Sequence, residues 1–409
     1  MLRIKVLLVT LTTVLISCGG SGVEEFTPPA NPSAPEEPTE KIVYHERAKA
    51  LFDLINQYYQ VKNGPTRGLY NENYPKQAGD LSASFLWPYD GLVSGAANLY
   101  ALGYDFDYKG MVDRFELYWR TSGDVNIGGY GSQTNGVSGS GTRFYDDNSI
   151  VGIDLVHAYK LTGDQTYLER AKRIVSFLKS GEDNIHGGGL WWNESQKNQA
   201  GVGDSNKPAC ANGYATLFLL EYYHVCASEE KTDVLAFAKR LYNWLYANLR
   251  DPEDNNYWND KQVNGTINKT KWTYNTGVMI SNGVRLYRIT GDEKYLDHAK
   301  ASAEGAYNYF VRPANGMALA YPANDPWFTI KLINAFVDIL PYYKTAQNYI
   351  DTFINFTDHA YEKARNQTGF FYEDWTGGSP KRIESLLMQA AALDGLSLIA
   401  LYKGEVAGQ

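Results

Sequence analysis

The feature that most constrains the fold of this chain is an internal repeat. Residues 158–164 (AYKLTGD) recur 128 positions later as residues 286–292 (LYRITGD), and each copy is followed by Tyr-Leu and then by Ala. Weaker copies occur at residues 99–103 (LYALG) and 223–229 (YHVCASE). The period is therefore roughly 60 residues, which suits a pair of helices with a loop at each end. The sequence predicts a chain built of repeated helical hairpins.

The two helices of each repeat have different patterns. The first is apolar nearly all round, which is typical of a buried helix. It ends at Gly, which suits the left-handed C-cap, and an Asp then begins the next helix. The second helix is amphipathic; in residues 165–179, Leu168, Ala171, Ile174 and Leu178 form one apolar stripe. The pattern predicts an inner layer of buried helices covered by an outer layer.

Six helices of each kind can be counted. The apolar helices are predicted at residues 91–102, 149–161, 211–227, 276–289, 329–343 and 383–402, and the amphipathic ones at 41–61, 107–120, 165–179, 231–249, 293–310 and 346–365. We therefore expect an all-α fold over residues 41–409, an (α/α)6 toroid of six inner and six outer helices. An open α-solenoid of the same hairpins is the alternative. The count of six and the lack of polar end repeats favour the closed ring.

The N-terminus has the pattern of an exported lipoprotein. Arg3 and Lys5 precede an apolar segment at residues 6–16, which is too short to span a membrane and predicts a signal peptide over residues 1–17. Residues 15–18 (LISC) resemble a bacterial lipobox, in which the chain is cleaved before Cys18 and that residue is lipidated. Residues 18–40 are rich in Gly, Pro and Glu and predict a disordered tether. We expect a monomer with a soluble fold, anchored by lipid to the outer membrane and facing the cell surface or the periplasm.

Composition argues against several classes of function. The net charge is -8 and no basic cluster occurs, so nucleic acid is not an expected partner. Cys210 and Cys226 lie 16 residues apart, on or beside one predicted helix. That spacing corresponds to about 24 Å, too far for a disulfide, so both are expected to be small buried residues. No Cys or His has the spacing of a metal ligand, and neither a metal nor a cofactor is predicted.

Polar and aromatic residues gather at the starts of the predicted inner helices. Parallel helices in a ring would bring these starts to one face. Amide and carboxylate groups hydrogen-bond hydroxyls, and indole and phenol rings stack on sugar rings, so the set predicts a carbohydrate cleft. Taken singly, the polar members are equally well explained as helix N-caps and the Trp residues as core. The candidate binding residues are Trp87, Asp90, Tyr145, Asn148, Trp191, Trp192, Asn206, Asn212, Trp272, Tyr274, Asn275 and Trp327.

Two adjacent acids, Asp146 and Asp147, stand at the second of these starts. They could be an N-cap and a partner for the helix dipole. They could instead be a catalytic pair, one protonated and one ionised, because close like charges push their pKa values apart. A retaining glycosidase needs two carboxyl groups about 5–5.5 Å apart, which neighbouring helical residues can approach. Arg143 could stabilise the ionised acid or be a surface charge.

Three segments resemble glycoside hydrolase family 76, the endo-α-1,6-mannanases. They are residues 145–148 (YDDN), 188–193 (GGLWWN) and 274–277 (YNTG), and the resemblance extends over about residues 44–403. It implies a retaining mechanism on α-1,6-linked mannan through a covalent glycosyl-enzyme intermediate. In that mechanism Asp146 would be the nucleophile and Asp147 the general acid/base.

Three other functions are compatible with parts of this pattern. A non-catalytic glycan-binding lipoprotein suits the lipobox and the aromatic cleft, but gains nothing from an acid pair. A sugar epimerase would need a pair of histidines, and of the six His only His186 lies in a predicted loop at the helix starts. A mannan transglycosidase, as in fungal relatives of the family, usually has a hydrophobic C-terminal anchor signal, which residues 403–409 (KGEVAGQ) do not resemble.

Overall fold

The computed structural model describes residues 42–323, 326–378 and 384–408. The predicted signal peptide (1–17), the lipidation residue Cys18 and the tether (18–40) lie outside these residues. Residues Val43–Gln409 form one compact unit, which contains all the helices described below.

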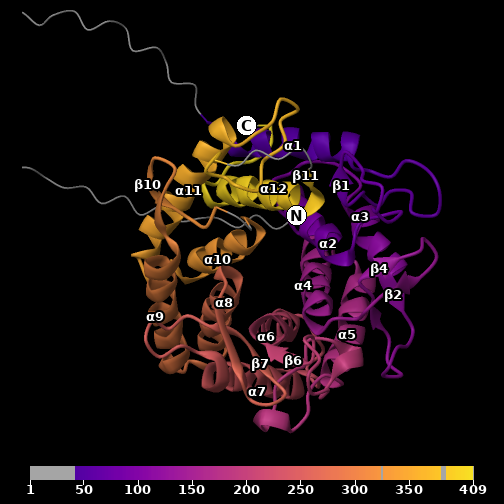
Figure 1. Cartoon of the computed structure of the whole chain (residues 1–409), viewed down its shortest axis with the longest axis vertical. Coiled ribbons are helices and arrows are strands. Elements are labelled where there is room, and N and C mark those ends of the chain that lie inside the picture. The colour runs from indigo at the N-terminus through magenta and orange to yellow at the C-terminus, as the bar shows by residue number, and fades with distance from the viewer. Residues whose placement is uncertain (1–41, 324–325, 379–383, 409) are drawn as a thin grey trace, which may run out of the picture. The chain divides into compact units, whose positions relative to one another are not determined.

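Twelve α-helices of this unit form two concentric rings (Figure 1). The inner ring consists of α2 (Leu86–Ala101), α4 (Tyr145–Thr162), α6 (Ala209–Tyr223), α8 (Thr273–Thr290), α10 (Pro326–Ile339) and α12 (Leu386–Tyr402). The outer ring consists of α1 (Tyr44–Tyr58), α3 (Tyr108–Asp113), α5 (Gln165–Lys179), α7 (Lys231–Leu249), α9 (Glu293–Phe310) and α11 (Ala346–Lys363). A 3-10 helix, Arg114–Tyr118, extends α3. The predicted all-α (α/α)6 toroid is confirmed.

The ring is closed. Each inner helix packs against the next, and α12 packs against α2. Asn98 of α2 donates a hydrogen bond to Asp394 of α12 across this seam (2.8 Å). At the C-terminus the Ala407 backbone N–H donates to the Leu102 carbonyl (2.9 Å). An open solenoid would leave the outer faces of α2 and α12 uncovered, so this alternative is excluded.

The burial of each helix follows the pattern predicted for its layer. In α12 every residue from Leu386 to Ala400 is buried, as expected for a helix surrounded by others. The outer helix α5 buries mainly one stripe. Gly163 and Gly291 end α4 and α8 in the left-handed conformation (φ 73° and 70°), which glycine adopts without steric cost. The prediction of a Gly stop is confirmed for these two helices, whereas α6 ends at His224 in the right-handed region, so the stop is not a property of every repeat.

Several inner helices begin earlier than the sequence pattern predicts. Helix α4 begins at Tyr145 rather than residue 149, and α2 at Leu86 rather than residue 91. The N-cap residues of α2, α4, α6 and α8 are Phe85, Phe144, Pro208 and Trp272, and none of them caps its helix with a side chain. The alternative interpretation of Asp90, Asp146, Asn212 and Asn275 as N-caps is therefore wrong: these residues lie inside the first turns.

Short antiparallel strands occur in the loops between helices. Four two-stranded pairs are β1 (Asn73–Tyr74) with β11 (Glu384–Ser385), β2 (Trp119–Arg120) with β3 (Gly129–Tyr130), β4 (Gln133–Thr134) with β5 (Gly139–Ser140), and β9 (Arg312–Ala314) with β10 (Met317–Ala320). A three-stranded sheet contains β6 (Asn206–Pro208), β7 (Trp258–Gln262) and β8 (Ile267–Lys271). Across the described ranges, none of the helices has the length and hydropathy needed to cross a membrane.

The space enclosed by the six inner helices is not lined by apolar side chains throughout. Toward the C-terminal ends of the inner helices it contains a second cavity of about 190 Å³ lined by charged side chains. Arg285 pairs there with Glu221 (2.5 Å) and Asp338 (2.6 Å), and Lys331 with Asp394 (3.1 Å). The inner helices were expected to be apolar nearly all round. The structure shows instead that the faces of these helices turned toward the centre of the ring carry an ion-pair network linking neighbouring helices.

Candidate active site

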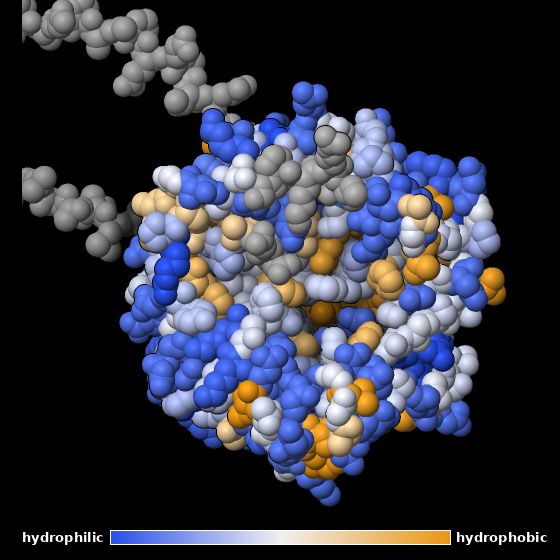
Figure 2. Space-filling model, in the orientation of Figure 1, coloured by the Kyte–Doolittle hydropathy of each residue, from blue (hydrophilic) through white to orange (hydrophobic). Residues whose placement is uncertain are grey.

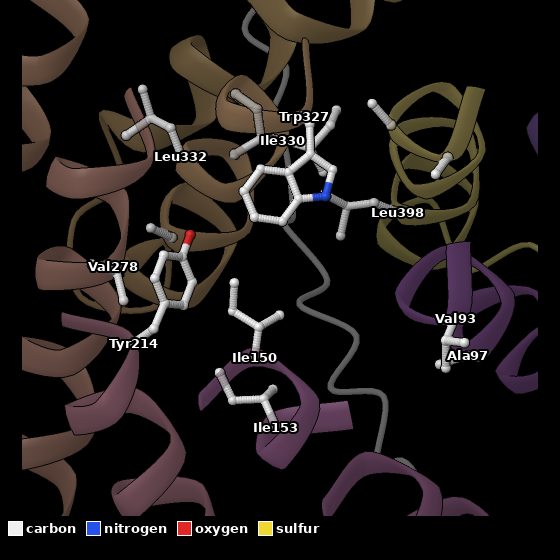
Figure 3. Packing of buried hydrophobic residues seen from close by; sticks show 14 of the residues in the cluster. Val93, Ala97, Ile150, Ile153, Tyr214, Val278, Trp327, Ile330, Leu332 and Leu398 are labelled. Atoms are coloured by element: carbon white, nitrogen blue, oxygen red, sulfur yellow. The ribbon is translucent and has the colours of Figure 1, made fainter. Parts of the chain in front are cut away.

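A cleft of about 420 Å³ lies where the first turns of the inner helices meet. Figure 2 shows the ring hollowed near its middle, with hydrophobic residues inside the hollow. Ile150, Tyr214 and Trp327 come from three different inner helices and point into the same space (Figure 3). The cleft is lined by Phe85, Trp87, Ser132, Phe144, Asp146, Asp147, Ile150, Trp192, Asn206, Pro208, Cys210, Tyr214, Asn259, Trp272, Tyr274, Trp327 and Phe328.

The two acids in this cleft have different surroundings. Asp146 accepts hydrogen bonds from the Trp192 indole N–H (3.0 Å and 3.1 Å to its two oxygens), from the Cys210 thiol (3.1 Å) and from the Asp147 backbone N–H (3.1 Å). Among the described residues, none donates a hydrogen bond to the Asp147 carboxyl. Two neighbouring side chains of the same type are thus distinguished by their environment.

This difference separates the proton affinities of the two acids. Burial raises the pKa of Asp146, and its hydrogen bonds act in the opposite direction because they stabilise the ionised form. Burial raises the pKa of Asp147 well above its usual range, and the charge of Asp146 raises it further. The arrangement therefore favours an ionised Asp146 beside a protonated Asp147, the charge state that acid-assisted nucleophilic attack requires.

The loop that carries Trp192 is tied to the start of α4 through its backbone. The Tyr145 N–H donates to the Trp192 carbonyl (3.0 Å), and the Trp192 N–H donates to the Asn206 carbonyl (2.9 Å). Two residues further along, buried Glu194 pairs with buried Arg143, whose Nε lies 2.6 Å from Oε2. Arg143 is therefore neither a surface charge nor a partner of Asp146. It holds the segment that positions the indole.

Aromatic rings form two opposite walls of the cleft. On the α10 side, Phe328 stacks on Tyr274 (centroids 4.1 Å apart) and lies 5.9 Å from Trp87 at an interplanar angle of 13°. Across the ring, Phe144 packs against Trp192 at 5.0 Å, next to the acids. At the rim, Phe85 and Trp272 remain 41% and 37% exposed, so their faces are open to a ligand. Flat apolar surfaces of this kind suit the C–H faces of sugar rings.

Several buried polar atoms of the cleft residues have no hydrogen-bond partner among the described residues. They include the Trp327 indole N–H, the Tyr214 hydroxyl and the Asn206 side-chain oxygen. Buried polar groups in proteins are nearly always paired, so such atoms in a cleft are suited to a ligand that supplies both donors and acceptors. A chain of hydroxyl-rich sugars is such a ligand.

The structure brings together eight of the residues predicted for this site. Asp146, Asp147, Trp87, Trp192, Asn206, Trp272, Tyr274 and Trp327 all line the cleft. The other six predicted residues do not line the cleft. They are Asp90, Tyr145, Asn148, Trp191, Asn212 and Asn275.

Asn148 and Asn212 hold loops in place. Asn148 accepts from the Tyr130 backbone N–H (2.7 Å) and donates to the carbonyl of the same residue (2.9 Å). Asn212 binds both backbone groups of Leu190 in the same way (2.7 Å and 3.1 Å). Their amides are thus fully used inside the protein, and what they contribute to the cleft is the position of its loops.

Tyr145 and Trp191 point away from the cleft. Tyr145 stacks on Phe177 of the outer helix α5, and its hydroxyl lies 3.1 Å from that of Ser180. The buried Trp191 indole donates to Asp183 (2.7 Å). In the segment WWN, only the second Trp faces the acids, because successive residues of an extended segment point in opposite directions.

Asp90 and Asn275 are buried below the lining of the cleft. Burial and the neighbouring Asp154 raise the pKa of Asp90 well above its usual range, while Lys331 acts in the opposite direction. Neither carboxyl oxygen of Asp90 has a hydrogen-bond partner among the described residues, so an ionised Asp90 would be a buried charge without a donor. Asn275 contacts Asn259, which does line the cleft, at 3.4 Å.

Nine further residues line the cleft that are not among those predicted from the sequence: Phe85, Ser132, Phe144, Ile150, Pro208, Cys210, Tyr214, Asn259 and Phe328. For one of them, Cys210, the repeat in the sequence contains a signal. Asp146, Cys210 and Tyr274 follow one another at intervals of 64 residues and so occupy the same position in three successive repeats. A residue equivalent to the acid on the neighbouring inner helix is expected to face it. For Ser132 and Asn259, which lie in loops outside the repeat, no such signal exists.

The described residues contain no group of three or more His, Cys, Asp or Glu side chains arranged to hold a metal ion. His186, the histidine predicted nearest to the site, contacts the Gln262 carbonyl through its ring (3.0 Å) and is not among the lining residues.

Comparison with known proteins places this fold and cleft in one family. The profile of Glycosyl hydrolase family 76 matches residues 43–401, so the chain belongs to this family. Mannan endo-1,6-alpha-mannosidase DCW1 of Candida albicans is 24% identical over 281 residues, which are 64% of this chain and 58% of that protein. The match therefore spans less than two thirds of the fungal relative.

Solved structures share the fold. A GH76 alpha-mannanase from Bacteroides thetaiotaomicron is 25% identical, with a TM-score of 0.74, and the match covers 88% of this chain and 96% of that one. An inactive variant of an alpha-1,6-mannanase from a Salegentibacter species, with two neighbouring Asp residues changed to Asn, was solved with alpha-1,6-mannotriose. It is 22% identical, with a TM-score of 0.71 and coverage of 88% and 99%.

Proposed function

We propose that this protein is an endo-α-1,6-mannanase that cleaves the backbone of α-mannan with retention of configuration. The observation that carries the proposal is the acid pair of opposed protonation on the floor of an aromatic cleft. Asp146, with three donors, is the nucleophile, and Asp147, with none, is the general acid/base. The names of the relatives supply the substrate: the fungal relative is a mannan endo-1,6-alpha-mannosidase, and the Salegentibacter protein binds alpha-1,6-mannotriose.

The reaction proceeds in two steps. Asp147 gives its proton to the glycosidic oxygen while the Asp146 carboxylate forms a bond to the anomeric carbon, and the bond between that carbon and the oxygen breaks. The shortened chain leaves. Asp147, now ionised, takes a proton from water, the water oxygen attacks the anomeric carbon, and Asp146 is released. The donors on Asp146 orient it for attack, and the apolar walls keep the pKa of Asp147 high.

The competing functions have less support. A glycan-binding protein has no use for two acids of opposed protonation. An epimerase that works with two histidines has none among the cleft residues.

Product analysis tests the activity. Wild-type protein incubated with linear α-1,6-mannan is expected to release a ladder of oligosaccharides, whose newly formed ends are initially α when followed by proton NMR. Asp146→Asn and Asp147→Asn are each expected to lower the rate by at least about 10³-fold, as for loss of a nucleophile or a general acid. Mannose alone would indicate exo action, an initial β product would exclude retention, and binding without products would support the glycan-binding alternative.

Azide rescue assigns the two roles. With an activated aryl α-mannoside, Asp147→Ala still forms the glycosyl-enzyme but lacks the base for water, so added azide is expected to speed turnover and yield the α-mannosyl azide. Asp146→Ala leaves room for azide to attack directly, which gives the β-mannosyl azide. The opposite products would exchange the two roles.

We further propose that the protein is a monomeric lipoprotein of the outer membrane. The support is the sequence alone: a positively charged start, a short apolar segment and the lipobox ending at Cys18. In bacterial cells, radiolabelled fatty acid is expected to label the wild type and not Cys18→Ala. Protease treatment of intact cells then distinguishes the cell surface from the periplasmic face. Labelling of the variant would contradict the proposed anchor.

A further inference from the structure

Cys210 is the least expected contact of the nucleophile. Its thiol lies on the first turn of α6, 6% exposed, with Sγ 3.1 Å from the Asp146 Oδ2. Tyr274 of α8 lines the same cleft and is an electrostatic neighbour of the thiol. Because Asp146, Cys210 and Tyr274 occupy the same position of three successive repeats, three neighbouring inner helices contribute one residue each to this part of the cleft.

The direction of the hydrogen bond between Cys210 and Asp146 follows from chemistry. The Asp146 carboxylate can only accept, so the thiol donates its proton to it. Burial raises the pKa of the Cys210 thiol well above its usual range, and the nearby Asp146 charge raises it further, so the sulfur keeps its proton.

A thiol is a weak donor, and this matters for a nucleophile. A strong donor would hold the carboxylate in place but lower its basicity and hence its reactivity. A methyl group would leave Oδ2 of Asp146 with the Trp192 indole but without a donor on the α6 side. An S–H group orients the carboxylate with a smaller loss of basicity than a strong donor would cause. A cysteine that only fills space would not need to place its sulfur 3.1 Å from the Asp146 carboxylate.

We propose that Cys210 is a positioning residue for the nucleophile, a weak donor that aligns Asp146. The inference rests on the proposed function, because it assigns Cys210 a part in the attack of Asp146. It also makes a claim about a hydrogen bond in the free protein, which can be tested without any substrate.

The groups that face Asp146 come from four elements. They are Asp147 of its own helix, the Trp192 indole of the loop, Cys210 and Tyr214 of α6, and Tyr274 of α8. From α2, Asp90 faces Asp147 rather than Asp146. Cys210 is the one of these groups whose donor strength can be changed in small steps, by substitution with Ser or Ala.

The test compares Cys210→Ser and Cys210→Ala with the matched control Cys226→Ala. Cys226 is similarly buried, 7% exposed, and within the described residues its thiol hydrogen-bonds to the Tyr223 carbonyl at 3.7 Å and to no carboxylate. Cys210→Ala removes the donor, so the pKa of Asp146 should rise and the acidic limb of the pH profile of kcat/KM is expected to move to higher pH. The value of kcat is expected to fall about tenfold with little change in KM. The stronger donor in Cys210→Ser is expected to move that limb to lower pH. Cys226→Ala keeps the wild-type profile.

Infrared spectroscopy of the S–H stretch supplies the independent readout. The difference between wild-type and Cys210→Ser spectra isolates the Cys210 band, which is expected at the low wavenumber of a thiol bonded to a carboxylate. In Asp146→Asn the band is expected to shift upward. An unshifted band, or identical acidic limbs in the wild type and both Cys210 variants, would overturn the inference. An inactive wild type with a shifting band would overturn the proposed mannanase and leave the hydrogen bond established.

Discussion

The chemistry of this site is determined by which donors reach which carboxylate. Asp146 and Asp147 are neighbours on one helix, and both are half-buried in the cleft. What separates them is a set of hydrogen bonds that all end on Asp146. Each donor stabilises the ionised form of that acid and thereby raises the cost of ionising the second one. The assignment of roles within the pair therefore depends on residues outside it.

Trp192 is expected to be the strongest of these donors, and Trp192→Phe tests it. The ring and its packing on Phe144 are retained, but both oxygens of Asp146 lose the indole N–H. The pKa of Asp146 should rise, so the acidic limb of kcat/KM should move to higher pH. At low pH kcat/KM should fall about tenfold or more, as for the loss of a hydrogen bond to a charged group. The pH profile measures both effects.

Trp191→Phe is the matched control for this change. Its indole donates to Asp183, on the far side of the segment from the acids. The variant is expected to lose some stability and to keep the acidic limb of the wild type. If both variants moved the limb equally, the effect would come from loop packing and not from the hydrogen bond to Asp146.

At the scale of single elements, amide side chains on inner helices fix the loops that build the cleft. Asn148 of α4, Asn212 of α6 and Gln389 of α12 each bind both backbone groups of one loop residue: Tyr130, Leu190 and Phe371. The same device is thus used three times around the ring. It places loops, such as the one that ends in Trp192, on a rigid scaffold.

Asn212→Ala is expected to destabilise the fold and the site together. The Leu190 N–H and carbonyl would lose their partner while buried, at a cost of about 2–3 kcal/mol in the free energy of unfolding. Because Leu190 lies two residues before Trp192, the indole should shift and kcat should fall. Urea denaturation followed by circular dichroism measures the first effect. Asn308→Ala, at an exposed position of α9, is the control and should change neither the free energy of unfolding nor kcat. If Asn212→Ala had the same free energy of unfolding as the wild type, Asn212 would not hold the loop in place.

The elements of this protein could be predicted well from the sequence, and the directions of their side chains only in part. Apolar periodicity located every helix, since a buried helix must be apolar over its length. The starts of α2 and α4 were placed too late because their first turns carry polar and aromatic side chains that face the cleft. Asn206 and Asn212 are both amides near the start of the same predicted helix. In the structure Asn206 lines the cleft, whereas Asn212 binds the backbone of a loop. Distinguishing them requires the course of loops outside the repeat.

At the scale of the whole molecule, the closed ring makes the first and last inner helices neighbours. Asp394 of α12 is 3% exposed and is bonded to both adjacent helices: Asn98 of α2 donates to one oxygen (2.8 Å) and Lys331 of α10 to the other (3.1 Å). One carboxylate therefore joins three inner helices at the place where the chain closes on itself. In an open array this side chain would lack its partner on α2.

Asp394→Ala should weaken this seam strongly. Lys331 would keep its buried charge but lose its ion-pair partner, and removing one member of a buried pair costs about 3–5 kcal/mol. The expected result is a lower midpoint of urea unfolding in one cooperative transition, because the seam belongs to the same core as the rest of the ring. Asp351→Ala, which removes an exposed carboxylate of the outer helix α11, should leave the midpoint unchanged. If Asp394→Ala unfolded in two separate steps, with α12 released first, the ring would have to be regarded as an open array whose ends merely touch.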